Sequence, residues 1–149
     1  MLFSVHRTGL NWRSAWFAVA LALRLAGVIL LAWIGDLHWQ LWQAGYGALP
    51  TLGPLFRVDA IAAVALAVAL LVWPRPLAGL VCTGFTAITL GALVVSLEFG
   101  LFGFREVITT THVAQALTVE SGTVLVLAAW TLIAARAAQT AARRSCWPA

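Results

Sequence analysis

Residues 58–97 read VDAIAAVALAVALLVWPRPLAGLVCTGFTAITLGALVVSL and contain two apolar runs, 58–73 and 77–97, joined by Trp73-Pro74-Arg75-Pro76. The runs have roughly the length of about 17–25 residues that an α-helix needs to cross a bilayer. They lack the alternation of polar and apolar residues that is typical of a membrane-spanning β-strand. Two prolines in three residues end one helix and begin the next, so this stretch predicts a tight helical hairpin.

Two further apolar runs, 14–34 and 114–135, flank the hairpin. Apolar residues make up 62% of the 149-residue chain and charged residues only 9%, with a mean hydropathy of +0.96. A soluble domain carries about 25% charged residues, and backbone groups in lipid must be hydrogen-bonded internally. The sequence therefore predicts an all-α membrane protein with one four-helix transmembrane domain over residues 1–149. The first run lacks a small-residue cleavage site before Gly35, so we interpret it as a retained helix, not a signal peptide.

Two stretches extend this pattern. Residues 36–43 contain no glycine or proline, so the first helix is expected to continue to about Gln43 and to end at Gly45 and Gly47. The basic run 134–144 is expected either to extend the fourth helix or to lie on anionic lipid headgroups.

The arginines predict the orientation of the chain. With the N-terminus in the cytoplasm, only Arg57 and Arg105 lie outside, as the positive-inside rule requires. The arginines on the inner side are then Arg7, Arg13, Arg75, Arg136, Arg143 and Arg144. We therefore expect a multi-pass protein of the inner (plasma) membrane with both termini cytoplasmic, and Trp73 and Trp130 at the inner interface. Because the basic residues are spread along the chain and form no stripe, nucleic acid is not an expected partner.

Two charges fall inside the predicted spans, Arg24 in the first and Glu120 in the fourth. A charge at the bilayer centre costs about 2.5–3.5 kcal/mol on insertion scales. An arginine–carboxylate contact reduces that cost, so we expect an intramembrane Arg24–Glu120 pair. The pair is interpreted first as a clamp between helices and second as a proton or anion site. In a third alternative, Arg24 makes no contact with Glu120 and reaches the inner interface.

Several polar residues lie near the predicted outer ends of the spans, and we expect them to form a solvated polar rim. They are Asp36, His38, Asp59, Glu98, Glu106 and His112. Histidine and carboxylate side chains together can bind a divalent metal. No two of these residues have the fixed spacing of metal ligands, so the sequence predicts no metal site.

Small residues predict where helices approach one another closely. Gly84, Ala87 and Gly91 recur on one face of the third run, and we expect this face to pack against another helix. The two cysteines, Cys82 in a span and Cys146 in the tail, are expected to be free thiols.

The segment HWQLWQAGYGALPTLGPLF (38–56), followed by GLFGFRE (100–106), resembles small four-span integral membrane proteins of actinobacteria. This resemblance covers most of the chain from the first span onward, and it implies fold and location only. In the number and size of its spans the chain also resembles the DoxX-type membrane proteins. Some of these are tied to quinone or thiol redox chemistry, but the resemblance carries over no catalytic residue.

No motif of known chemistry is present, so the sequence predicts no catalytic residue and no cofactor. The leading hypothesis is a non-enzymatic accessory or structural subunit of a membrane complex. Its partners would be the lipid bilayer and either another protein or a second copy of the chain. The first alternative is a small proton-coupled carrier that uses Arg24, Asp59 and Glu120. The second is a DoxX-like, quinone-linked redox accessory.

Overall fold

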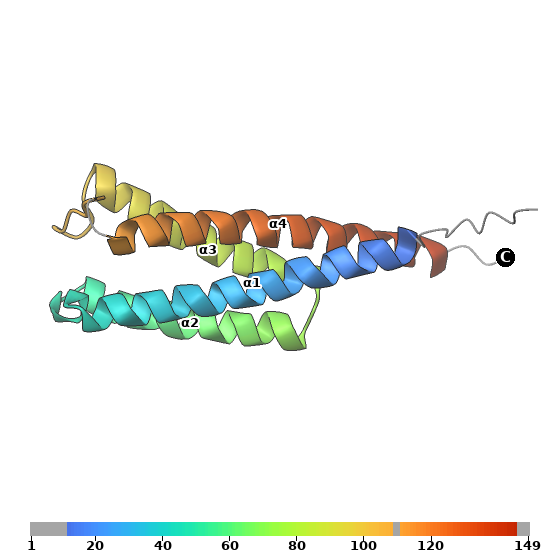
Figure 1. Ribbon diagram of the computed structural model, residues 1–149, viewed down its shortest axis with the longest axis horizontal. Helices are drawn as coiled ribbons and strands as arrows, with labels where there is room; N and C mark the ends of the chain where they lie inside the picture. Colours follow the sequence, from blue (N-terminus) through green and yellow to red (C-terminus); the bar gives the residue numbers. More distant parts are fainter. Residues whose placement is uncertain (1–11, 109–110, 146–149) are drawn as a thin grey trace, which may run out of the picture.

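The computed structural model describes residues 12–108 and 111–145, and it confirms an all-α four-helix bundle (Figure 1). The helices are α1 (Trp12–Gln43), α2 (Leu52–Val72), α3 (Pro76–Glu98) and α4 (Thr111–Ser145), with a short 3-10 helix, η1 (Tyr46–Ala48). All four α-helices are long and apolar enough to cross a membrane. The chain is therefore a multi-pass membrane protein.

The helix boundaries follow from local chemistry. α1 continues to Gln43 and the chain turns at Gly45, whose φ of 131° suits glycine, as the sequence predicted. Residues 73–75 are not helical and form the turn of the hairpin, and Pro76 begins α3 after an extended Arg75. α4 runs without interruption through the basic stretch to Ser145, so this stretch extends the fourth helix.

The helices are not packed equally. α1 packs against α2 and α4, and α3 packs mainly against α4, whereas α2 and α3 make few contacts with each other. Figure 1 shows why: α2 and α3 meet at the hairpin and diverge toward the opposite end. We call the end with residues 73–75 the hairpin end, and the opposite end, with residues 44–51 and 99–108, the loop end. The divergence separates α2 from α3 at the loop end.

Glycine does bring helices together, but not where the sequence predicted. Gly84, Ala87 and Gly91 are exposed, and a Cβ added at either glycine would meet nothing within 4 Å, so the predicted packing face is wrong within this chain. The close approach on α3 is made by Gly79, where a Cβ would lie 2.6 Å from the Trp130 ring. Trp130, expected at the membrane interface, is therefore buried in the core.

α1 and α4 extend past the hairpin end of the bundle, as Figure 1 shows on its right-hand side. Arg24 lies level with the last turn of α2, because its guanidinium contacts the carbonyls of Leu70 and Leu71. Residues 12–23 of α1 therefore project beyond α2. This projecting stretch carries exposed apolar side chains, including Trp16 and Phe17.

Candidate functional site

Arg24 and Glu120 do not meet, which corrects the predicted charge pair. The Arg24 Nε donates to the Leu70 carbonyl at 3.0 Å, and its Nη2 donates to the Leu71 carbonyl. These carbonyls belong to the last turn of α2, where carbonyl oxygens receive no intrahelical N–H and the negative end of the helix dipole attracts a cation. Glu120 lies instead near His38. His38 is 14 residues beyond Arg24 in α1, or about 21 Å at the rise of an α-helix. The prediction failed because the bundle begins at Arg24, so this residue lies at the hairpin end and not in mid-span.

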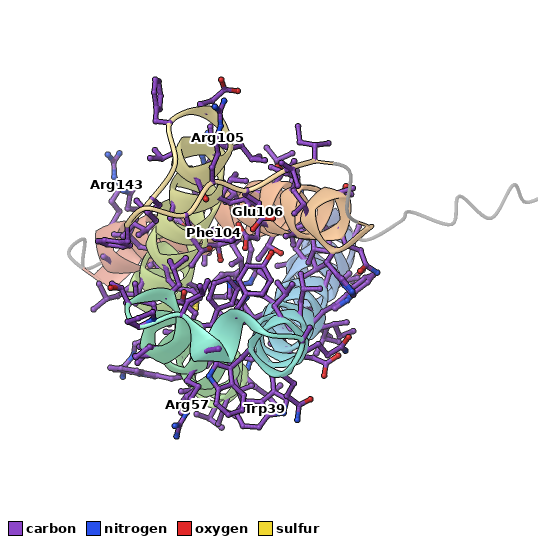
Figure 2. The ribbon with its side chains drawn as sticks, turned by 90° about the vertical axis from the view of Figure 1, so that its left-hand side faces the viewer. Trp39, Arg57, Phe104, Arg105, Glu106 and Arg143 are labelled. Atoms are coloured by element: carbon purple, nitrogen blue, oxygen red, sulfur yellow. The ribbon has the colours of Figure 1, made fainter. Side chains whose placement is uncertain are left out.

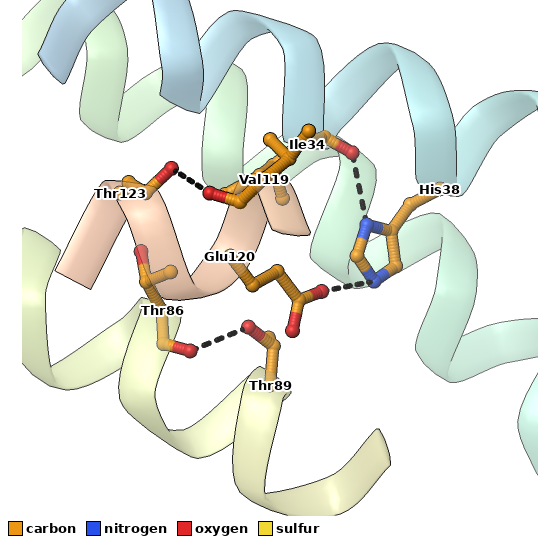
Figure 3. Close-up of polar contacts among 7 residues, drawn as sticks. All are labelled: Ile34, His38, Thr86, Thr89, Val119, Glu120 and Thr123. Atoms are coloured by element: carbon orange, nitrogen blue, oxygen red, sulfur yellow. Dashed lines mark hydrogen bonds and ion pairs between the residues drawn. The ribbon is translucent and has the colours of Figure 1, made fainter. Parts of the chain in front are cut away.

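Glu120 and His38 form a buried pair between α4 and α1 (Figure 3). Glu120 is only 2% exposed, and its Oε1 lies 3.9 Å from the His38 Nε2. That separation is within ion-pair range but longer than a direct hydrogen bond. The second carboxyl oxygen, Oε2, is buried and has no hydrogen-bond partner among the residues that the structure describes. A buried acceptor without a partner is costly, so the arrangement is unusual for a purely structural contact.

The hydrogen bonds of His38 determine what it presents to Glu120. The Nδ1 lies 2.9 Å from the carbonyl oxygen of Ile34, one turn earlier in α1. Because a carbonyl only accepts, Nδ1 must carry a hydrogen. The Nε2 then faces Glu120 either as a lone pair or, when the ring is cationic, as an N–H donor. One proton placed between Nε2 and Glu120 turns two facing acceptors into a compatible pair.

The buried threonine hydroxyls near this pair donate to backbone carbonyls of their own helices. Thr89 donates to the Thr86 carbonyl at 2.9 Å, and Thr86 donates to the Cys82 carbonyl at 3.0 Å. Thr123 likewise donates to the Val119 carbonyl at 2.6 Å. Figure 3 shows the Glu120 carboxyl directed toward Thr89, whose hydroxyl lies close enough to interact with it. Because that hydroxyl has one hydrogen, it serves either the Thr86 carbonyl or Glu120.

A cavity of about 120 Å³ adjoins the pair at the loop end, between all four helices. A water molecule needs about 10–15 Å³ of such space, so the cavity has room for several waters or one small ligand. Its wall is mostly apolar, with polar side chains at a few points. The polar and ionisable residues that line it are His38, Tyr46, Asp59, Thr89, Ser96, Glu106, His112 and Glu120.

Two loop residues close the cavity from outside. The Tyr46 hydroxyl, in η1, donates to the Glu106 Oε2 at 2.8 Å and thereby joins the two loops at this end. Burial, this hydrogen bond and the charge of Glu106 raise the pKa of the Tyr46 phenol well above its ordinary value. In the view of Figure 2, Phe104 and Glu106 lie over the middle of the bundle, whereas Trp39, Arg57 and Arg105 lie at its edge.

The residues expected in a solvated rim divide into two groups. Asp36 and Glu98 are exposed, and Asp36 accepts a hydrogen bond from Gln40 at 2.7 Å. His38 and Glu106 are buried, so a solvated position is wrong for these two. Asp59 is partly buried and His112 is exposed, yet both line the cavity. Within the described residues, no group of three His, Cys, Asp or Glu could hold a metal ion.

Sequence reasoning missed the His38–Glu120 pair because it placed His38 beyond the end of the first span. A signal was present, since Ile34 and Leu41 flank His38 at helical spacing and lie on the same buried face. Of the two cysteines, Cys82 is buried with a free thiol, and Cys146 lies outside the described residues, as do Arg7 and the side chains of Arg13 and Arg144.

The fold and this site define a four-helix membrane protein with a buried histidine–glutamate pair beside a cavity. Comparison with protein-family models, with curated proteins and with solved structures finds no match for the chain.

Proposed function

We propose that the protein is a small proton-coupled carrier in which His38 and Glu120 bind and release a proton inside the helix bundle. The observation that carries this proposal is the buried Glu120 carboxyl, 3.9 Å from His38 and with one oxygen unpartnered. Ionisable residues inside membrane spans are costly and are therefore retained chiefly along ion and proton paths. Arg24, which the sequence had assigned to the carrier site, has no part in this version.

The surroundings of the pair support proton exchange with the outside of the bundle. Asp59 lines the same cavity from α2 and provides a third ionisable group. Leu55 and His112 line the cavity and are also exposed, so the cavity wall reaches the surface at the starts of α2 and α4. The divergence of α2 and α3 gives this end of the bundle room to move, because few contacts join the two helices.

The test is pH-difference infrared spectroscopy on the protein in lipid, which detects the C=O stretch of a carboxyl group as it gains a proton. We expect a carboxyl band in the wild type that is absent from Glu120→Gln. Glu98→Gln is the matched control, because Glu98 is exposed at the same end of the molecule, and it should retain the band.

Reconstituted vesicles test the carrier step. Proton flux, followed with a pH-sensitive dye in the lumen, should fall to the level of empty vesicles in Glu120→Gln and persist in Glu98→Gln. Identical infrared spectra for the wild type and Glu120→Gln would rule out the proton site. A titrating band without any flux would keep the proton site and remove the carrier.

A quinone-linked redox role has less support. A quinone headgroup presents two carbonyl oxygens and therefore needs donors in the wall of its site. The hydroxyls of Tyr46 and Thr89 at the cavity already donate elsewhere, which leaves Ser96 and the two histidines as the donors in the described part of its wall.

The second candidate is the accessory subunit that the sequence suggested, and the projecting start of α1 favours it. Phe17 on this stretch is 72% exposed, because it lies beyond the last turn of α2 and no helix of the described bundle covers it. A photo-crosslinker at Phe17 should capture a protein partner in native membranes, whereas one at Ile88, 73% exposed on α3, should capture mainly lipid. Equal capture at the two positions would argue against a partner on this stretch.

A further inference from the structure

We infer that the loop-end cavity binds a small organic amine in its cationic form, with Glu120 as the counter-ion. This inference rests on the proposed proton site at Glu120, and it adds the chemical class of the ligand. It follows from three independent properties of the cavity wall: its hydrogen-bonding groups, its charges and its aromatic rings.

The wall has acceptors to spare and few donors. The Glu120 Oε2 has no partner, although Glu120 is 2% exposed and lines the cavity. The Tyr46 hydroxyl donates to Glu106. The Thr89 hydroxyl lies beside the Glu120 carboxyl but donates to the Thr86 carbonyl at 2.9 Å, so it can serve Glu120 only by giving up that bond. A ligand that brings its own donor satisfies the Glu120 Oε2 and leaves this bond in place. An ammonium group has up to three N–H donors and no acceptor.

The charges agree with a cationic ligand. Within the described part of the chain, three carboxyl groups line the cavity, those of Asp59, Glu106 and Glu120, and no arginine does. The two arginines nearest in sequence to the loops are directed elsewhere. Arg57 lies over the Trp42 ring at 5.5 Å, and the Arg105 Nε donates to the Leu97 carbonyl at 3.2 Å. An anionic ligand would meet three carboxyl groups, and among the described residues only the two histidines of the wall could offset their charge.

Aromatic rings form part of the apolar wall, beside aliphatic side chains. Phe56 packs against Tyr46 with ring centroids 4.9 Å apart and against His38 at 5.5 Å, and Phe104 meets Tyr46 at 5.6 Å. Ring faces attract cations, and the attraction grows when water is excluded. The cavity of about 120 Å³ is similar to cavities of about 150 Å³ that admit benzene. The wall thus fits a small amine with an apolar body.

An amine and a proton would compete for the same carboxyl group. A cation bound at Glu120 replaces the proton, and a proton bound there removes the counter-ion, so binding of one releases the other. The ionisable groups that face the cavity are His38 from α1, Asp59 from α2, and His112 and Glu120 from α4, with Tyr46 and Glu106 from the loops. Because α3 contributes no ionisable side chain to this wall, the competition is confined to these groups.

Three probes with one ring and different head groups test the inference: benzylamine, benzyl alcohol and benzoate. Equilibrium dialysis against the full protein in detergent, with empty micelles as the blank, measures their binding at neutral pH. We expect benzylamine to bind more tightly than benzyl alcohol by about tenfold or more, as a charge-assisted contact implies, and benzoate not to bind. Tetramethylammonium, which is cationic but has no N–H donor, should bind more weakly than benzylamine.

The variants locate the binding. Glu120→Gln should weaken benzylamine binding by about tenfold and leave the binding of benzyl alcohol unchanged. Asp59→Asn provides a second test should Glu120→Gln fail to fold, and Glu98→Gln should behave as the wild type. Equal binding of benzylamine and benzyl alcohol, or unchanged benzylamine binding in both cavity variants, would overturn the inference.

The two proposals fail separately. The infrared test measures proton binding without any amine. A protein that shows the Glu120 band but does not distinguish benzylamine from benzyl alcohol keeps the proton site and loses the amine. Amine binding that depends on Glu120 in a protein without a titrating band would keep the amine site and remove the proton site.

Discussion

Tyr46 is the residue that closes the loop end, and its chemistry can be followed in isolation. It is the only tyrosine in the chain, and the sequence contains no lysine. Its hydroxyl donates to Glu106, which is buried and lies 60 positions away in the sequence. The bond therefore joins the connection after α1 to the connection after α3. Among the described residues, Tyr46 and Glu106 make no other hydrogen bond between these two connections.

Tyr46→Phe should lower the free energy of unfolding by about 1–3 kcal/mol at neutral pH, because it removes the donor to the Oε2 of buried Glu106 and leaves only the Val107 N–H on Oε1. The raised pKa of the folded phenol means that the native state holds this proton more tightly than the unfolded state does. That stability is fully present below about pH 10, the ordinary value for tyrosine, and is lost as the pH rises beyond it toward the folded pKa.

Thermal unfolding in detergent at pH 8 and pH 11 measures this effect. The wild type should lose more stability between the two values than Tyr46→Phe, which serves as the baseline for all other ionisations. Tyrosinate absorbance at pH 11 should appear only on unfolding. A full tyrosinate signal in the folded protein would contradict the contact with Glu106.

At the scale of the helices, glycine marks a close contact only where a neighbouring helix is present. Gly79 lies against Trp130 and Thr131 of α4, and Gly27 lies against Leu127. Gly84 lies little more than one turn beyond Gly79 on the same helix and faces open space. Gly79 and Gly84 therefore form a matched pair on α3 with opposite surroundings.

Gly79→Ala should destabilise the bundle by about 1–3 kcal/mol, because the added methyl overlaps the Trp130 ring. Gly84→Ala should leave stability unchanged or raise it by up to about 1 kcal/mol, since alanine favours the helix and nothing blocks it. Denaturation in detergent, followed by tryptophan fluorescence, compares the two. Equal losses in both variants would show that Gly84 also faces a packed surface.

The same contrast explains what the sequence could predict. Run length and the Pro74–Pro76 break predicted four helices and the hairpin, because those depend on local composition and on the bilayer. Small residues permit close packing but do not select a partner, so the face of Gly84 and Gly91 was predicted wrongly. The pairing of His38 with Glu120 depends on how far α1 slides along α4. That offset is set by tertiary packing, such as Ile34 against Ala63 and Val119, and is absent from either helix sequence.

At the scale of the molecule, both described chain ends, at Trp12 and Ser145, lie at the hairpin end. Arg75, Arg136 and Arg143 also lie at the hairpin end. Arg57 and Arg105 lie at the loop end. The positive-inside rule therefore predicts a cytoplasmic hairpin end in a plasma membrane.

Cysteine labelling tests this orientation in a background without Cys82 and Cys146. Val107→Cys and Gln139→Cys place single thiols at exposed positions of opposite ends. In intact cells a membrane-impermeant maleimide should label position 107 and reach position 139 only after lysis. Labelling of position 139 alone in intact cells would reverse the orientation.

The unequal reach of the helices gives the molecule two hydrophobic lengths. The part of α1 that is a candidate membrane span covers 30 residues, or about 45 Å, and includes Arg24 and Asp36, whereas that of α2 covers 21 residues, or about 32 Å. A hydrocarbon core of about 30 Å matches α2 but not α1, and such a mismatch is met by tilt or by local thickening of the bilayer. The lipid around this protein is therefore not equivalent on all sides: acyl chains beside α1 and α4 must adapt to a longer surface than those beside the hairpin.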